Sequence, residues 1–241
     1  MNNLAMVYDN QGKYAQAEAL NSQVLETKRR VLGPEHSETL ISMNNLAWSQ
    51  SLQGKYALAQ PLYMQVLETR RRVLGPEHPY TLFTLSAVAS MFQKQGKYIL
   101  AEDYAAKALE GRRHALGPEH RDTMTAAADL ALAYQSQGKF VASEPLAREA
   151  LATDIKKRPD DWRRFRAESL LGASLAGQKK YSEAEPMLLE GYQGMVARKD
   201  RMPVPDQYYL DRAGEWIAQL YQAWDKPLKA AEWREKNNRQ R

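Results

Sequence analysis

The 241-residue sequence contains no cysteine, which excludes disulfide bonds and thiolate metal sites and is typical of a reducing compartment. No apolar run approaches the roughly 20 residues that a membrane-spanning helix needs. The opening stretch, MNNLAMVYDNQGKY, lacks the basic and apolar regions of a signal peptide. Positive charge is only slightly in excess, with 34 Lys and Arg against 29 Asp and Glu, which permits acidic partners without requiring nucleic acid. We therefore expect a cytoplasmic protein that has no membrane partner.

What the sequence does contain is a repeat. The tetrapeptide Gly-Pro-Glu-His begins at Gly33, Gly75 and Gly117, so its period is 42 residues (75 − 33 and 117 − 75). A catalytic loop is needed only once, whereas a motif at a fixed period indicates stacked structural repeats. A second motif, glycine and lysine followed by an aromatic residue, has the same period: Gly12-Lys13-Tyr14, Gly54-Lys55-Tyr56, Gly96-Lys97-Tyr98 and Gly138-Lys139-Phe140.

Each repeat has the pattern of a helical hairpin. Apolar residues recur at helical spacing on both sides of Gly54, and a glycine there can adopt the left-handed conformation that ends a helix. Gly75-Pro76 ends the second helix, and Pro79 suits the first position of the next one. No stretch has the alternation of a β-strand. Four C-terminal tryptophans lie at helical spacing and are expected in the core: Trp162, Trp216, Trp224 and Trp233.

We therefore predict an all-α fold, a single right-handed superhelical solenoid of about six antiparallel helix hairpins over residues 1–241. The predicted hairpins are a partial one (1–32), three regular ones (33–74, 75–116 and 117–157) and two divergent ones (158–199 and 206–241), the last ending in a capping helix. In the divergent hairpins Arg158-Pro159-Asp160 replaces the GPEH motif, and Asp225 replaces the turn glycine.

The pattern LNNLAxVYxxQGKYxxAExL resembles the tetratricopeptide repeat, whose usual form has about 34 residues. Ala17, Ala59, Ala101 and Ala184 match the small position in the family's second helix, and Ser143 departs from it. The longer form with LGPEHPxT is similar to that of kinesin light chain and of many bacterial tetratricopeptide arrays. The last two hairpins resemble the closing segment of arrays that follow bacterial serine/threonine kinase domains. These resemblances imply a non-catalytic protein-interaction scaffold, part of a larger signalling protein.

In tetratricopeptide arrays the first helices of successive repeats line a concave groove, which the resemblance makes the expected site for a peptide or loop. Asn3 and Asn45 match the asparagine with which peptide-binding members hold a ligand's backbone, and an amide suits this role because it both donates and accepts. Ala87 and Asp129 replace it in later repeats. The expected groove residues are Asn3, Met6, Asn44, Asn45, Trp48, Phe83, Ser90, Lys94, Asp129 and Leu132. The alternative is that Trp48 and Phe83 only fill space between first helices.

The third GPEH copy continues as His120-Arg121-Asp122, a triplet known from kinase catalytic loops. Such a loop needs an asparagine five residues after the aspartate, and that position is Ala127. The three GPEH histidines cannot share a metal, because neighbouring repeats lie on the order of 10 Å apart and metal ligands lie within about 2 Å of the ion. We expect these histidines to start helices, and we expect no catalysis, no cofactor and no metal.

Basic triplets recur near the ends of the second helices: Lys28-Arg29-Arg30, Arg70-Arg71-Arg72 and Arg112-Arg113-His114. Positive charge there complements the negative end of the helix dipole. Interleaved acidic residues and the lack of an aromatic stacking platform favour a solvated helix end. The alternative function is a basic ridge that binds nucleic acid or an acidic protein surface, with nucleic acid the less favoured partner.

The segment Met1–Ala5 aligns with Met43–Ala47, so the sequence opens inside a first helix without a preceding GPEH loop. Solenoids need capped ends to stay soluble. We therefore expect either a longer array or self-association through the uncapped N-terminal end.

Overall fold

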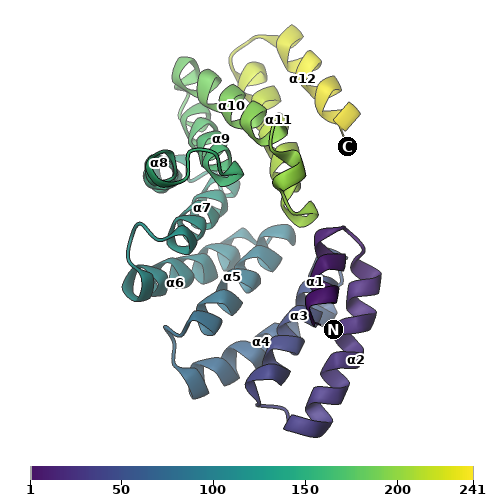
Figure 1. Ribbon diagram of the computed structural model, residues 1–241. Helices are drawn as coiled ribbons and strands as arrows, with labels where there is room; N and C mark the ends of the chain where they lie inside the picture. Colours follow the sequence, from purple (N-terminus) through teal and green to yellow (C-terminus); the bar gives the residue numbers. More distant parts are fainter. Residues whose placement is uncertain (1, 241) are drawn as a thin grey trace. The chain divides into compact units, whose positions relative to one another are not determined.

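The fold is that of a computed structural model, which describes the backbone of residues 2–240 and the side chains of residues 3–238. Within these residues every regular element is a helix. The α-helices form six hairpins: α1 (Asn2–Asn10) with α2 (Tyr14–Leu32), α3 (Ser37–Leu52) with α4 (Tyr56–Leu74), α5 (Pro79–Lys94) with α6 (Tyr98–Leu116), α7 (Arg121–Ser136) with α8 (Phe140–Lys157), α9 (Trp162–Gly177) with α10 (Tyr181–Val196), and α11 (Tyr208–Ala223) with α12 (Pro227–Gln240) (Figure 1). Two 3-10 helices, η1 (Lys199–Arg201) and η2 (Val204–Asp206), lie between α10 and α11. The predicted all-α repeat fold is confirmed.

The chain divides into two compact units. Unit 1 comprises Met1–Leu116 with Pro203–Pro205, and unit 2 comprises Gly117–Met202 with Asp206–Arg241. Within each unit the second helix of one hairpin packs on the first helix of the next, as α2 does on α3 and α8 on α9. The first helices also touch one another: α1 and α5 both contact α3, and α7 and α11 both contact α9. The continuous solenoid over 1–241 stays a prediction.

The turn inside each hairpin uses a left-handed residue. Gly12, Gly54, Gly96 and Gly138 have φ between 73° and 76°, which confirms the sequence prediction. The divergent hairpins keep the same conformation with other residues, because Lys179 has φ 64° and Asp225 has φ 56°. L-residues with a β-carbon adopt this region at a cost of roughly 1–2 kcal/mol, so the repeat requires the backbone shape and tolerates the side chain.

The GPEH motif forms the connection between hairpins. In its first copy, Gly33 has φ 88° and ψ 166°, a region that is essentially restricted to glycine. His36 caps α3, because its Nδ1 accepts a hydrogen bond from the backbone N–H of Glu38 at 3.2 Å. Thr39 Oγ1 then donates to the Gly33 carbonyl at 2.8 Å. The same two bonds recur in the copies that begin at Gly75 and Gly117, so the predicted helix-starting role of the histidines is confirmed.

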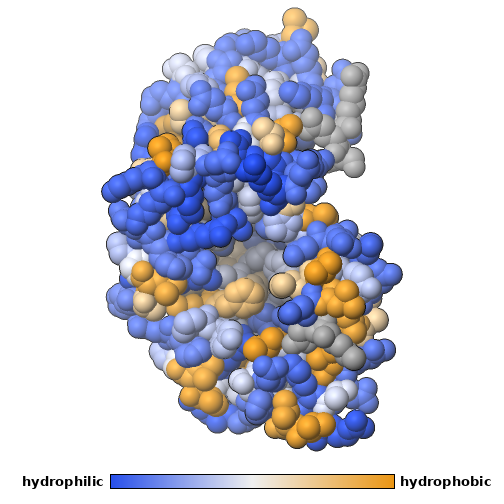
Figure 2. All heavy atoms as spheres, viewed as in Figure 1, coloured by the Kyte–Doolittle hydropathy of each residue, from blue (hydrophilic) through white to orange (hydrophobic). Residues whose placement is uncertain are grey.

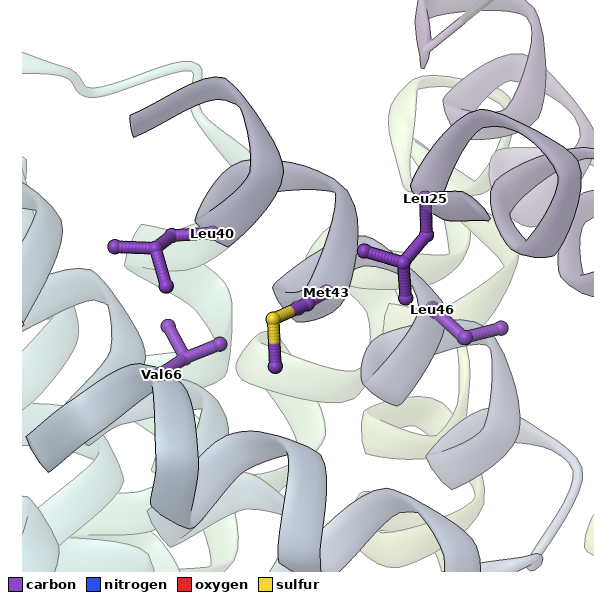
Figure 3. Close-up of a cluster of buried hydrophobic side chains, with 5 residues drawn as sticks. All are labelled: Leu25, Leu40, Met43, Leu46 and Val66. Carbon is purple, nitrogen blue, oxygen red and sulfur yellow. The ribbon is translucent and has the colours of Figure 1, made fainter. Parts of the chain in front are cut away.

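The core is built where three consecutive helices meet. In unit 1, Met43 of α3 is fully buried between Leu25 of α2 and Val66 of α4, with Leu40 and Leu46 beside it (Figure 3). Each such side chain contributes roughly 1.5–3 kcal/mol when it is fully buried. The next hairpin repeats the arrangement with Leu67, Leu82, Leu85 and Ala108.

The C-terminal tryptophans divide into two kinds. Trp162 and Trp216 are buried, as predicted. Trp224 and Trp233 are only partly buried, so the core prediction is wrong for them. Trp224 follows α11 at the turn to α12 and stacks on Tyr181, and Trp233 of α12 packs edge-on against Tyr192. None of the helices within residues 2–240 is sufficiently long and apolar to cross a membrane.

Candidate protein-interaction face

The first helices of unit 1 bring together residues that are far apart in the sequence. Met6, Trp48 and Ser90 occupy equivalent positions, 42 residues apart, on α1, α3 and α5. The Lys94 ammonium of α5 lies 5.8 Å from the centre of the Trp48 ring of α3, a distance at which a cation attracts the face of an aromatic ring. This contact places Trp48 and Lys94 on the same side of α3 and α5.

Several apolar and amide groups on these helices reach solvent. Met6 and Phe83 are 57% and 53% exposed, Asn3 is also exposed, and Asn45 and Trp48 are half-buried. Figure 2 shows hydrophobic patches between hydrophilic ones over the part of the surface formed by α1–α6. We call the following set the first-helix face of unit 1: Asn3, Met6, Asn45, Trp48, Phe83, Ser90 and Lys94.

Three predicted groove residues have other roles. Asn44 is only 3% exposed, and its Oδ1 accepts a hydrogen bond from Thr84 Oγ1 at 3.3 Å, so it links α3 to α5 inside unit 1. Leu132 is 2% exposed and belongs to the core of unit 2. The prediction that these two residues line an open surface is wrong. The side chain of each lies on the buried side of its helix.

Asp129 is the third, and it already has a partner. Its carboxylate pairs with the guanidinium of Arg166, a buried residue of α9. The Tyr209 ring of α11 lies 4.0 Å from the same guanidinium. The first helices of unit 2 are thus joined by a charged and aromatic cluster, and Asp129 is held within it.

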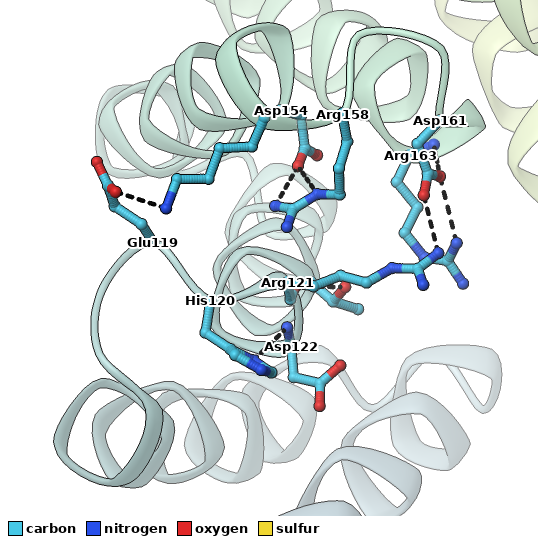
Figure 4. Close-up of polar contacts among 10 residues, drawn as sticks. Glu119, His120, Arg121, Asp122, Asp154, Arg158, Asp161 and Arg163 are labelled. Atoms are coloured by element: carbon cyan, nitrogen blue, oxygen red, sulfur yellow. Dashed lines mark hydrogen bonds and ion pairs between the residues drawn. The ribbon is translucent and has the colours of Figure 1, made fainter.

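The His-Arg-Asp triplet has structural contacts throughout. His120 Nδ1 accepts from the backbone N–H of Asp122 at 3.1 Å and caps α7. Arg121 pairs with Asp161 at 2.8 Å, and Arg163 reaches the same carboxylate at 3.3 Å (Figure 4). Asp161 itself caps α9 by accepting from the backbone N–H of Arg163 at 3.0 Å. Each of these contacts connects or starts helices, so the triplet has a structural role in this fold.

The basic triplets are less solvated than predicted. Arg70 is buried, and its Nη1 donates to Thr84 Oγ1 at 2.7 Å and to the Tyr80 carbonyl at 3.0 Å. Burial lowers the pKa of Arg70 to about 10. Arg112, at the equivalent position, is also buried. For these two residues the prediction of a solvated helix end is wrong, because both are buried, and Arg70 packs on α5, the first helix of the next hairpin.

The glutamates of the GPEH motif pair with basic residues at the end of the following second helix. Glu35 pairs with Arg72, Glu77 lies 3.1 Å from His114 Nδ1, and Glu119 pairs with Lys157 at 2.7 Å. These pairs are exposed to solvent, so each contributes little to stability. They nevertheless neutralise part of the basic ridge that the sequence pattern suggested.

Sequence reasoning missed a buried polar cluster in unit 1. Asp9 of α1 is 3% exposed, and its Oδ2 accepts from Ser49 Oγ at 2.8 Å. Asn21 Nδ2 donates to the same Ser49 oxygen at 3.0 Å. The available signal was the spacing from Ala5, which is fully buried and lies four residues before Asp9 on the same helix face.

A search for metal sites covered the residues that the structure describes. Among them, no group of three or more His, Asp or Glu side chains is arranged to hold a metal ion.

Comparison with known protein families identifies the family of this chain. The tetratricopeptide repeat model matches residues 1–72, 52–113 and 83–156, which together cover more than half of the chain. The protein therefore belongs to the tetratricopeptide repeat family. A comparison with curated protein sequences gave no match.

Solved structures with the same fold include kinesin light chain-like proteins. A putative kinesin light chain from Podosopora anserina, with nearly identical TPR-like repeats, has 24% identity and a TM-score of 0.69 over 83% of this chain and 95% of its own. BtubC (BKLC) from P. vanneervenii has 19% identity and a TM-score of 0.68 over 94% of this chain and 90% of its own. At these identities the likeness shows the fold, and it confirms the predicted resemblance to kinesin light chain-type repeats.

Proposed function

We propose that the protein is a non-catalytic interaction scaffold and that the first-helix face of unit 1 binds a peptide or loop of a partner protein. Tetratricopeptide repeats generally mediate protein–protein interaction, which supports the general class. The observation that carries the more specific proposal is the exposure of Met6 on α1 and of Phe83 on α5, because both helices contact α3, which bears the half-buried Trp48. Large apolar side chains grouped on a surface are typical of interaction sites.

The proposed ligand has one bulky apolar residue lying against Trp48. Asn3 and Asn45 supply amides that can both donate to and accept from a ligand backbone. The side chains of both residues reach solvent, so a ligand can approach them. We expect micromolar affinity, about −8 kcal/mol.

The test begins with peptides selected from a display library on the wild-type protein. Trp48→Ala should weaken their binding by about 2 kcal/mol, as truncation of a central aromatic residue does, with little change in the melting curve. Ile99→Ala is the matched control, because Ile99 is an exposed apolar residue of a second helix. Unfolding of unit 1 by Trp48→Ala, or unchanged binding to Asn45→Ala/Trp48→Ala, would refute the assignment of this face.

The basic ridge remains the alternative surface. Arg71 and Arg113 are exposed members of two triplets. Arg72 and His114 of the same triplets face glutamates. Salt-dependent binding to random DNA at physiological ionic strength would favour this alternative over the peptide site.

Self-association through α1 also stays a proposal. Leu4 and Val7 of α1 are exposed, and a second copy could cover them. Sedimentation of Leu4→Glu beside the wild type would test it, since a true contact through α1 should be lost in the variant.

A further inference from the structure

Asp9 is an acid in an unusual place. It lies in α1, a helix of nine residues, and its carboxyl group is buried against α2 and α3. Oδ2 accepts one hydrogen bond, from Ser49 Oγ of α3, while Oδ1 is buried without a partner among the described residues. Burial of an ionised carboxylate with a single neutral donor is costly.

Among the described residues, no cationic group pairs with the Asp9 carboxyl group. From α2 the polar group is Asn21, and from α3 it is Ser49. From α4 it is Tyr63, a phenol whose pKa is raised by burial first and by the charge of Asp9 second. Lys13, in the turn that follows α1, is exposed, and its ammonium lies 5.9 Å from the centre of the Tyr8 ring. Lys55, in the turn after α3, pairs with Glu18 at 2.6 Å. Buried atoms of Asn21 and Tyr63, Oδ1 and the hydroxyl, also have no partner in the described part of the chain. A neutral carboxyl group can donate to such an interior, whereas a carboxylate can only accept.

We propose that Asp9 is a proton-operated latch on α1: the neutral carboxyl group holds α1 against α2 and α3, and ionisation loosens it. The link is direct, because the Asp9–Ser49 bond joins α1 to α3 and Ser49 is bonded in turn to Asn21 of α2.

The electrostatics give the direction of the latch. Burial raises the pKa of Asp9 from its ordinary value of 3.8 to about 6, against a smaller lowering by Ser49. An acid whose pKa is higher in the docked state favours docking below its ordinary pKa, and this contribution is lost as the pH rises through the docked-state pKa. The docking equilibrium of α1 should therefore fall by about fiftyfold between about pH 4 and about pH 7.

The functional consequence rests on the proposed function of unit 1. Helix α1 carries Asn3 and Met6 of the first-helix face. Loosening α1 removes both from their places beside α3. Acidification therefore favours the complete face, and a rise toward neutral pH shifts α1 toward the loosened state.

Two measurements on the whole chain test the latch without any partner. A carbon-13 NMR titration should give the Asp9 carboxyl group a pKa near 6, and a value close to its ordinary 3.8 overturns the proposal. Hydrogen exchange of the α1 amides, corrected for the intrinsic rate, should show the fiftyfold loss of protection in the wild type. Asp9→Asn, which cannot ionise, should have a flat profile.

The matched control is Asp103→Asn, which removes an exposed carboxylate of α6 that pairs with Lys107. It should keep the wild-type slope. A flat wild-type profile, the wild-type slope in Asp9→Asn, or an α1 that is unprotected in Asp9→Asn at every pH would each overturn the latch. Because no ligand is present, failure of the peptide site would leave all of these results unchanged.

Discussion

The regular hairpins of residues 2–157 and the divergent hairpins of residues 162–240 make the same turns from different residues. Gly96 and Lys179 both adopt left-handed φ, at 75° and 64°. His120 and Asp161 both cap a first helix through a side-chain acceptor. The comparison teaches that the repeat constrains backbone shape and capping chemistry, and that residue identity can drift as long as those two are kept.

The two sets differ in how closely their helices approach. In the divergent hairpin α9–α10, Gly191 lies so close to α9 that a β-carbon there would sit 2.7 Å from the Phe165 carbonyl oxygen and from the Ser169 nitrogen. The turn glycine Gly54, in a regular hairpin, has open space where its β-carbon would be. Gly191 therefore serves helix packing, whereas Gly54 serves backbone conformation.

The first helices differ as well. In unit 1 they carry the exposed Met6 and Phe83 and the half-buried Trp48. In unit 2 the equivalent helices are joined by the buried Arg166, its partner Asp129 and the Tyr209 ring. A ligand would have to displace a satisfied ion pair to bind those residues of unit 2, which is why the proposed site is confined to unit 1.

The largest expected effect comes from a substitution that tests the close packing of α9 and α10. Gly191→Ala should lower the free energy of unfolding by about 3 kcal/mol, because its β-carbon meets backbone atoms that cannot move aside. Gly54→Ala is the control, and it should cost only about 1 kcal/mol for its positive φ. Urea denaturation followed by circular dichroism measures both. Equal midpoints for the two variants would mean that α9 and α10 do not approach as described.

A second substitution tests the turn geometry. Gly96→Val should cost about 2 kcal/mol, more than the roughly 1 kcal/mol typical of exposed glycine changes, because a β-branched residue is poorly tolerated at positive φ. Gly96→Asn should cost less than Gly96→Val, since asparagine visits this region more readily. A Gly96→Val protein that melts like the wild type would contradict the turn assignment.

Most of the fold was predictable because the same residue pattern recurs in several repeats. A glycine that recurs at Gly12, Gly54, Gly96 and Gly138 indicates a required conformation, and all four proved left-handed. The histidine caps followed from the position of GPEH between two helical patterns. The helix pattern alone also located the first-helix positions of Met6, Trp48 and Phe83.

The remaining site details depend on helix rotation and on contacts between repeats. Asn44 and Asn45 are adjacent in sequence, yet one is buried against Thr84 and the other is half-buried. A rotation of about 100° per residue decides between the two, and the approximate spacing of apolar residues does not fix it. Pairs such as Asp129–Arg166, 37 residues apart, and the unpaired acid Asp9 arise only once the hairpins stack.

A pH experiment sharpens the contrast between buried and exposed acids in unit 2. Burial raises the pKa of Glu168 to about 7, Glu190 adds to the rise and Arg164 opposes it. Since the folded-state pKa lies above the ordinary value of 4.5, this group favours folding below about pH 4.5 and that contribution is lost as the pH rises toward 7. The free energy of unfolding should therefore fall by roughly 1–2 kcal/mol as the pH rises from about 5 to about 8. The urea midpoint should fall with it.

Glu168→Gln should make this slope shallower, and the part of the slope that comes from Asp9 should remain. The control is Glu144→Gln, because hydrogen bonds from Gln178 and Arg148 lower the pKa of Glu144 to about 2. Glu144 is ionised throughout that pH range, so its replacement should shift the curve without changing the slope. An unchanged slope in Glu168→Gln would show that the carboxyl group is not buried as described.

The smallest expected effect concerns the turn residue of a divergent hairpin, compared with the turn glycine of the regular hairpins. Lys179 stands where the regular hairpins have glycine, and its φ of 64° is disfavoured for a residue with a β-carbon. Lys179→Gly relieves roughly 1 kcal/mol of strain in the folded state, but glycine also gives the unfolded chain more freedom, worth about 0.4–1 kcal/mol. The net gain should be no more than about 0.5 kcal/mol. Lys180→Gly, at a neighbouring residue with φ −83°, has no strain to relieve and should only destabilise. If Lys179→Gly lost as much stability as Lys180→Gly, Lys179 would not be strained in the folded state. The turn of the divergent hairpin would then differ from the glycine turns of the regular hairpins.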